Sequence, residues 1–211
     1  MIDGGLIGKE GKSAKKAGNR GDMICLDKTR ILTIIPFHGI DPGLAADTGR
    51  AAASMFGLRS MTGGGLAVPA AAWERRRRQY RSAALLGELA EVVREAAPDE
   101  VLLGITAHDL FIPGLNYIFG EADHDSGVAV ISLARLAPTQ AGTAGTRLFR
   151  ERVLKESIHE LGHIFGLAHC PDEACIMHFS NTIADTDVKG PGFCARCGTL
   201  LFGAGMAGAA V

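Results

Sequence analysis

The segment His159-Glu160-Leu161-Gly162-His163-Ile164-Phe165-Gly166-Leu167-Ala168-His169 combines three histidines with one glutamate at spacings that suit a metal site. On a helix, His159 and His163 differ in direction by only about 40° and in height by about one turn, so both imidazoles can reach one ion. Glu160 is placed too poorly to share that ion, but it can hold an attacking water and take its proton. The pattern predicts two zinc ligands and a general base on one helix.

A third ligand requires the chain to turn after this helix. If the helix continued, His169 would lie about 15 Å along the axis from His159 and about 80° off the ligand face. Glycine at the position after a helix adopts positive φ freely, so Gly166 is predicted to end the helix and bring His169 to the same metal. Three neutral ligands leave the fourth position open, which is typical of a catalytic zinc that lowers the pKa of water to about 7. A rival ligand set would replace His169 by Asp185 or Asp187, but the Gly166-x-x-His169 spacing favours the histidine.

Four of the five cysteines lie in the segment after His169, between Cys170 and Cys197. Cys170 and Cys175 form one pair, and Cys194-Ala195-Arg196-Cys197 forms another after a loop, which is the spacing of a closed tetrahedral thiolate zinc site. A redox-active Cys194-x-x-Cys197 pair is the alternative, but it leaves the first pair unexplained. We therefore expect two Zn²⁺ per chain, one catalytic and one structural.

Two sulfur-containing residues carry less information. Met177 lies two residues beyond Cys175, and from the sequence alone a methionine there is more often core filler than a functional element. Cys25 stands apart from the other cysteines, and we expect it to be an ordinary buried thiol.

The composition describes an ordinary globular chain. Its 211 residues and 47% hydrophobic content predict one domain with a core that needs no disulfides. A formal net charge of −1 indicates neither nucleic acid nor an anionic membrane as a partner. No signal-peptide pattern and no run of about 18 apolar residues is visible, so we expect a cytoplasmic protein. We also expect a monomer.

Hydrophobic periodicity and Gly/Pro punctuation predict an α/β (α+β-like) fold with a mixed sheet packed by helices. The expected strands are 31–35, 101–106, 117–119 and 128–133, with an acidic turn at 121–125, and the expected helices are 41–56, 81–97 and 146–165. Residues 1–22 are predicted to be a disordered lead-in, 23–202 a single domain and 203–211 a flexible tail. The run Arg75 to Arg78 is interpreted as a solvated helix face without a function.

The pattern from His159 to His169, followed by a methionine, resembles the metzincin clan of zinc peptidases. Cys170-x4-Cys175-x-Met177 and the later Cys194-x-x-Cys197 narrow the resemblance to the archaemetzincins. The segments 119–122 and 132–136 also resemble the upstream region of that family. The region from His159 to Cys197 covers about a fifth of the chain.

This resemblance implies a specific architecture and a specific role for several residues. It implies a twisted mixed sheet, an active-site helix, and a small zinc-bound C-terminal subdomain that begins at about residue 167. It implies that Met177 is the Met-turn residue, which forms a floor beneath the catalytic zinc. It also implies that the histidines, Glu160 and the four cysteines have the roles derived above. It also implies an edge strand, here 125–130, along which an extended peptide would pair.

The leading hypothesis is zinc-dependent hydrolysis of peptide bonds, with Glu160 as the general base. One alternative is a hydrolase that acts on a non-peptide amide or ester. Another is a zinc-stabilised module that binds peptides without turnover, although the intact Glu160 favours an enzyme. The sequence leaves aminopeptidase and endopeptidase action open.

Overall fold

The computed structural model describes residues 30–95, 100–139 and 142–203. The predicted lead-in 1–22, Cys25 and most of the predicted tail lie outside these residues. Within the described ranges, no helix combines the length and the apolar character needed to cross a bilayer.

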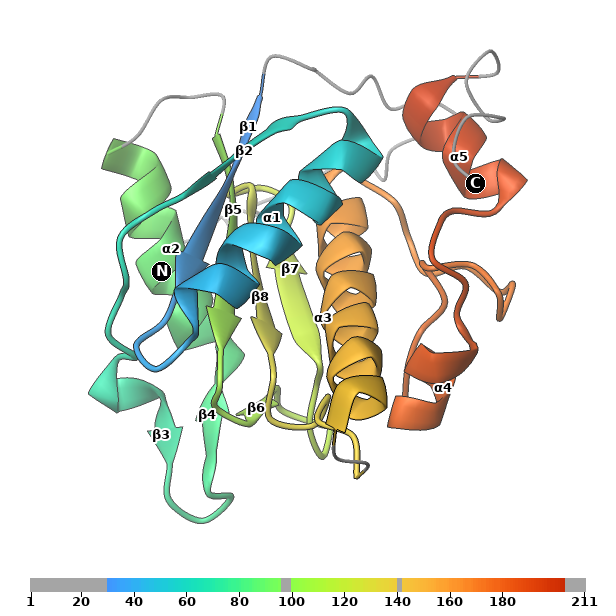
Figure 1. Cartoon of the computed structure of the whole chain (residues 1–211). Helices are drawn as coiled ribbons and strands as arrows, with labels where there is room; N and C mark the ends of the chain where they lie inside the picture. Colours follow the sequence, from blue (N-terminus) through green and yellow to red (C-terminus); the bar gives the residue numbers. More distant parts are fainter. Residues whose placement is uncertain (1–29, 96–99, 140–141, 204–211) are drawn as a thin grey trace, which may run out of the picture.

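A five-stranded mixed sheet forms the centre of the molecule (Figure 1). Its order is β2-β1-β5-β8-β7, in which the first four strands are parallel and β7 is antiparallel to β8. The strands are β1 (Ile31–Pro36), β2 (Arg59–Thr62), β5 (Glu100–Thr106), β7 (Gly120–Asp123) and β8 (Val128–Ser132). A smaller sheet contains β3 (Trp73–Glu74), β4 (Gln79–Arg81) and β6 (Leu110–Phe111). The predicted α/β class with a mixed sheet is confirmed.

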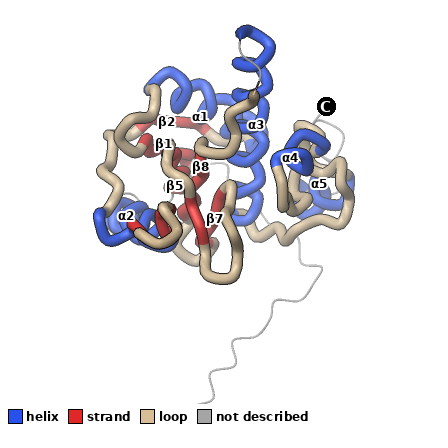
Figure 2. Tube along the Cα trace, turned by 90° about the horizontal axis from the view of Figure 1, so that it is seen from below, coloured by secondary structure: helices blue, strands red, loops and turns tan. Residues whose placement is uncertain are grey.

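Helices cover both faces of the large sheet, as Figure 2 shows from below. The helices of the described residues are α1 (Pro42–Phe56), α2 (Ser82–Glu95), α3 (Gly142–Ile164), α4 (Ile183–Val188) and α5 (Ala195–Phe202), with a 3₁₀ turn at Ala70–Ala72. Side chains alternate along each strand. Leu32 and Ile34 of β1 therefore join the core beneath α1 and α3, whereas Ile35 joins the core beneath α2. The helices α4 and α5 lie beyond α3.

Most of the predicted elements are confirmed. The strands at 31–35, 101–106 and 128–133 correspond to β1, β5 and β8, and the predicted helices correspond to α1, α2 and α3 within a few residues. The local signals at α1 are both in use. Asp41 caps the helix by accepting a hydrogen bond from the Leu44 amide at 2.7 Å, and Gly57 ends it with φ 68°.

The prediction around the hairpin before β8 is wrong by a few residues. Within 117–119 only Ile118 makes an isolated bridge, and the strand is β7, with the turn at 124–127. The edge of the sheet is likewise β7 and not 125–130, because β8 lies between β5 and β7. Pairing of Gly120 with Ile131 and of Asp123 with Val128 overrides the low strand propensity of glycine and aspartate.

The prediction that Arg75 to Arg78 lie on a helix is also wrong. These four exposed residues form the turn of the β3–β4 hairpin, in which Trp73 pairs with Tyr80. Arg78 has φ 56°, and its amide donates to the Glu74 carbonyl at 2.9 Å. A tight reversal that is closed by strand pairing thus replaces the helix.

Aromatic rings join the C-terminal segment to the main body. Phe56, fully buried at the end of α1, lies 4.9 Å from the ring of Phe165 and 5.7 Å from that of Phe193. Phe193 in turn lies 6.2 Å from Phe202 of α5. Such edge and tilted pairs add to the free energy of apolar burial.

We predict that Phe56→Ala lowers the free energy of unfolding by about 3–5 kcal/mol, because it empties the centre of this cluster. Urea denaturation of the zinc-loaded protein would measure the change. The control is Val188→Ala at a side chain that is 62% exposed, for which we expect a change within about 0.5 kcal/mol. Equal effects of the two substitutions would contradict the importance of the cluster.

Candidate active site

The helix α3 carries His159, Glu160 and His163 and ends in a turn that redirects the chain. Gly166 has φ 88°, its amide donates to the His163 carbonyl at 2.9 Å, and the Leu167 amide donates to the Gly162 carbonyl at 2.9 Å. This pair of hydrogen bonds is a Schellman motif, which satisfies carbonyls that the helix end would leave free. The returning chain places His169 beside the histidines of the helix.

The three histidines converge on one point. The Nε2 atom of His163 lies 3.1 Å from Nε2 of His159 and 3.2 Å from Nε2 of His169. Two nitrogen ligands of a tetrahedral zinc are separated by about 3.3 Å, because each Zn–N bond is about 2.0–2.1 Å. The spacing of the three imidazoles therefore fits a zinc ion.

The other ring nitrogens of His159 and His163 are held by backbone carbonyls. Nδ1 of His159 donates to the Ile176 carbonyl at 2.8 Å, and Nδ1 of His163 donates to the Leu167 carbonyl at 2.7 Å. With the proton on Nδ1, the lone pair of Nε2 points to the common centre. Burial lowers the pKa of all three imidazoles, that of His169 to about 4, so the rings are neutral near pH 7 as ligation requires.

The rival carboxylates are engaged elsewhere. Asp185 accepts hydrogen bonds from the Thr182 amide and hydroxyl and caps α4, and Asp187 forms a bidentate pair with Arg152 at 2.7 Å. The structure therefore does not bring either aspartate into the histidine group.

Glu160 is almost completely buried and lies beside the histidines at a cavity of about 340 Å³. Burial raises the pKa of Glu160 well above its ordinary value, and the nearby carboxylate of Glu156 adds to this effect. The cavity walls come from β7, from the loop 112–119 that precedes it, and from 179–181. The Tyr117 hydroxyl donates to the Asn181 carbonyl at 2.8 Å and so joins two of these walls.

Met177 packs directly against α3. It is fully buried, and a Cβ added at Gly162 would lie 2.4 Å from its sulfur. The side chain of Met177 therefore occupies the space that the missing side chain of Gly162 leaves on the surface of α3. The sequence pattern treats Gly162 as a free position, and only the tertiary contact explains the glycine.

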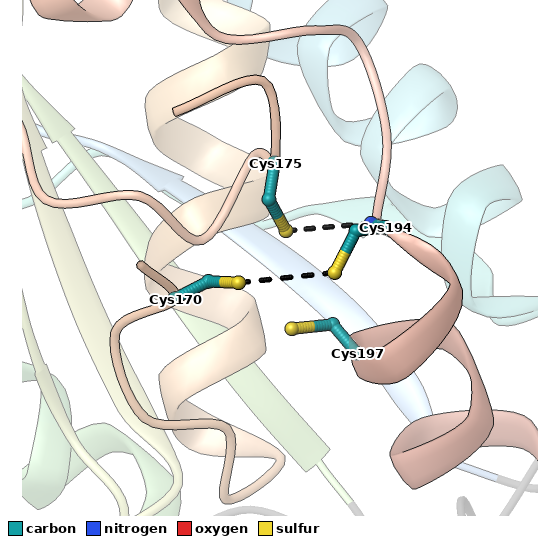
Figure 3. A group of neighbouring side chains, drawn as sticks. All are labelled: Cys170, Cys175, Cys194 and Cys197. Atoms are coloured by element: carbon teal, nitrogen blue, oxygen red, sulfur yellow. Dashed lines mark hydrogen bonds between the residues drawn. The ribbon is translucent and has the colours of Figure 1, made fainter. Parts of the chain in front are cut away.

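The four cysteines form a second group, which Figure 3 shows. Their sulfur atoms all lie within 4.8 Å of one another, and those of Cys170 and Cys194 are 3.8 Å apart. Two thiolate ligands of a tetrahedral zinc are separated by about 3.8 Å, since the Zn–S bond is about 2.3 Å. Cys170 and Cys175 come from the loop after α3, whereas Cys194 and Cys197 lie at the start of α5. The group thus connects two segments.

A buried ion pair that sequence reasoning missed lies behind His159. The Lys189 ammonium is completely buried, 3.1 Å from Oε1 of Glu156 and 3.4 Å from Nδ1 of His159. The same Glu156 oxygen accepts a hydrogen bond from the Thr186 hydroxyl at 2.9 Å. Glu156 lies one helical turn before Glu160, a spacing that the sequence shows, but nothing in the sequence pairs it with a lysine 33 positions later.

The fold and the two side-chain groups can be compared with known proteins. Residues 65–202 match the sequence profile described as "Peptidase family M54". A histidine triad with an adjacent glutamate, on a chain that matches this profile, defines a zinc metallopeptidase.

Individual relatives agree with that class. The archaemetzincin of Pyrococcus furiosus is 48% identical over 122 residues, which are 57% of this chain and 63% of that relative. The archaemetzincin of Thermococcus kodakarensis is 38% identical over 174 residues, covering 80% of this chain and 93% of the relative. The crystal structure of the archaemetzincin from Methanopyrus kandleri superposes with a TM-score of 0.70 at 34% identity, covering 88% of this chain and 97% of the other. The chain belongs to peptidase family M54, the archaemetzincins.

We predict that Lys189→Met lowers the free energy of unfolding by about 3–5 kcal/mol, because it leaves the buried Glu156 carboxylate without its cation. The double variant Glu156→Gln/Lys189→Met should recover most of this loss, since no buried charge then remains unpaired. Urea denaturation of the wild type, both single variants and the double variant would measure the coupling. A double variant as unstable as Lys189→Met would contradict this account.

Proposed function

We propose that His159, His163 and His169 hold a catalytic zinc ion and that Glu160 is the general base in the hydrolysis of peptide bonds. The observation that carries the proposal is the convergence of three Nε2 atoms beside a buried carboxylate. The Nε2 atom of His163 lies 3.1 and 3.2 Å from those of the other two histidines. Zinc in such a site polarises the scissile carbonyl and lowers the pKa of water to about 7.

The residues of the chain supply the remaining chemistry. The Glu160 carboxylate accepts the proton of the attacking water and then delivers it to the nitrogen of the leaving amine. The raised pKa of Glu160 supports this role, because a carboxylate with a pKa closer to neutrality holds the proton more readily between the two steps. The neutral imidazoles of His159 and His163 are fixed through their Nδ1 atoms, and the turn after α3 places His169. These contacts keep the ligand group in place.

The substrate is proposed to be an extended peptide that pairs with the free edge of β7. This strand is the edge of the sheet beyond β8, and its residues Gly120, Glu121 and Ala122 line the cavity together with Glu160. An edge strand offers backbone N–H and C=O groups that an extended chain can pair with, irrespective of its side chains. The match to a peptidase family favours peptide bonds over other amides as the scissile group.

The four cysteines are proposed to hold a second, structural zinc ion. Four thiolates leave no open position for water or substrate, so this ion would stabilise the turn that contains His169 and Met177. Cys170, Cys175, Cys194 and Cys197 are all free of disulfides, which fits a reducing, cytoplasmic environment. We further propose that residues 23–202 form one catalytic domain divided near Gly166, with Met177 as the floor beneath the first metal.

We predict that Glu160→Gln lowers kcat by about 10²–10⁴-fold, because the amide cannot accept the proton of water. Cleavage of a mixed peptide library, followed by mass spectrometry, would measure the rate. Zinc analysis of the same sample serves as the control and should equal the wild-type value. A zinc-loaded variant that cleaves at the wild-type rate would rule out Glu160 as the base.

We predict that Cys197→Ser lowers the zinc content from two equivalents to one and lowers kcat, because the adjacent residues His169 and Cys170 link the two sites. His163→Asn should also remove one equivalent, and the combined variant should retain none. Elemental analysis of the purified proteins would give these values. Two equivalents retained by Cys197→Ser would contradict the thiolate site.

A further inference from the structure

The first residue of the edge strand lies in contact with the carboxylate side chain of Glu160. A Cβ built on Gly120 would lie 2.6 Å from both Cγ and Oε1 of Glu160 and 2.8 Å from its Cδ. A Cβ atom essentially never lies within 3.0 Å of a nonbonded heavy atom. Gly120 is not among the residues with positive φ, so its backbone conformation suits any amino acid. Only the neighbouring glutamate requires a glycine here.

The strand itself is held too firmly to retreat from Glu160. Gly120 pairs with Ile131 in the β7–β8 ladder, and the Ser132 amide donates to the Phe119 carbonyl at 2.7 Å. On the opposite face, the hydroxyl of the fully buried Ser82 donates to the carboxylate of Glu121. The ladder and this anchor fix β7 on both sides of Gly120.

The side chain of Glu160 is the partner that can move. It lines the cavity, so it has open space beside it, and among the described residues its carboxylate accepts no hydrogen bond. Its position therefore depends on packing, above all on its contact with the backbone of Gly120. A methyl group at this point would displace the carboxylate into the cavity at little cost to the fold.

From these contacts we infer that Gly120 is a positioning residue for Glu160. The absence of a side chain lets the edge strand lie directly against the glutamate, which holds the carboxylate at one place beside the strand that would bind the peptide. This inference rests on the proposed role of Glu160 as the base. It assigns to Gly120 an effect on the chemical step rather than on folding or on metal binding.

The test compares Gly120→Ala with Gly87→Ala in the zinc-loaded full chain. Gly87 lies on α2, where an added Cβ meets nothing within 4 Å, so this control introduces the same methyl group without a collision. We expect Gly120→Ala to lower kcat by about 100-fold, because a displacement of about 1 Å in a reacting group can cost that much. We expect KM and zinc content to stay close to those of the wild type and of the control, and the melting temperature not to fall below that of the wild type.

Two further measurements separate positioning from packing. In a Glu160→Gln background, Gly120→Ala should cause no further loss of rate, because the base that it displaces is already absent. A purely structural role would give the same loss in both backgrounds. A crystal structure of zinc-loaded Gly120→Ala should show β7 in place and the Glu160 side chain moved.

Several results would overturn the inference. One is an unchanged kcat together with an unmoved Glu160 side chain. Another is a displaced β7 strand, and a third is a Gly120→Ala variant that fails to fold or loses zinc. The second and third results would show that Gly120 serves packing. If the wild type itself cleaves no peptide in the library, the proposed function fails. The crystal structures of wild type and variant would then still decide whether Gly120 sets the position of the Glu160 side chain.

Discussion

The reversal of the chain at Gly166 is the constraint on which the rest of the site depends. A helix that continued past Ile164 would carry His169 away from His159 and would leave only His159 and His163 together. The two hydrogen bonds of the Schellman motif fix the direction of the exit as well as its place. Cys170 follows immediately, so its amide reaches the Met177 carbonyl at 2.9 Å and closes the loop. The positions of the histidine group, of the buried Met177 and of the cysteine group therefore all follow from one turn.

Most of the polar side chains that α3 carries into the interior have a hydrogen-bond or ion-pair partner there. The imidazoles of His159 and His163 pair with backbone carbonyls, and Glu156 pairs with Lys189 and Thr186. At two glycines, one on α3 and one on the facing strand β7, the constraint is close packing. Met177 fills the gap at Gly162, and β7 approaches Glu160 through Gly120. Glu160 differs from its neighbours because, among the described residues, packing rather than hydrogen bonding holds its carboxylate.

Local patterns account for the parts of the molecule that were predictable. The period of α3, the caps of α1 at Asp41 and Gly57, and the apolar runs of β1, β5 and β8 are all signals within a few residues. The spacing of the three histidines along one helix and across one turn likewise predicted that they lie together. The errors came from pairing between distant segments. Gly120 to Asp123 form a strand only because β8 lies beside them, and Arg75 to Arg78 form a hairpin turn only because Trp73 pairs with Tyr80. Gly120 and Lys189 could not be identified from the sequence for the same reason, since their partners Glu160 and Glu156 are about 40 and 33 positions away.

The same distant pairing gives the arginine run a structural role at the cleft. Arg77 donates to the carbonyls of Leu115 and Asn116 at 2.7 and 2.8 Å, and Gln79 donates to the Asn116 carbonyl at 2.9 Å. Leu115 and Asn116 belong to the loop that forms one wall of the cavity beside the histidine group. Backbone carbonyls in such a loop have no partners in a strand ladder, so side-chain donors must satisfy them. Ordering an exposed side chain for this purpose costs conformational entropy, and a rigid hairpin reduces that cost. The hairpin of β3 and β4 thus fixes one wall of the cavity from outside the large sheet, and β7 and α3 supply other lining residues.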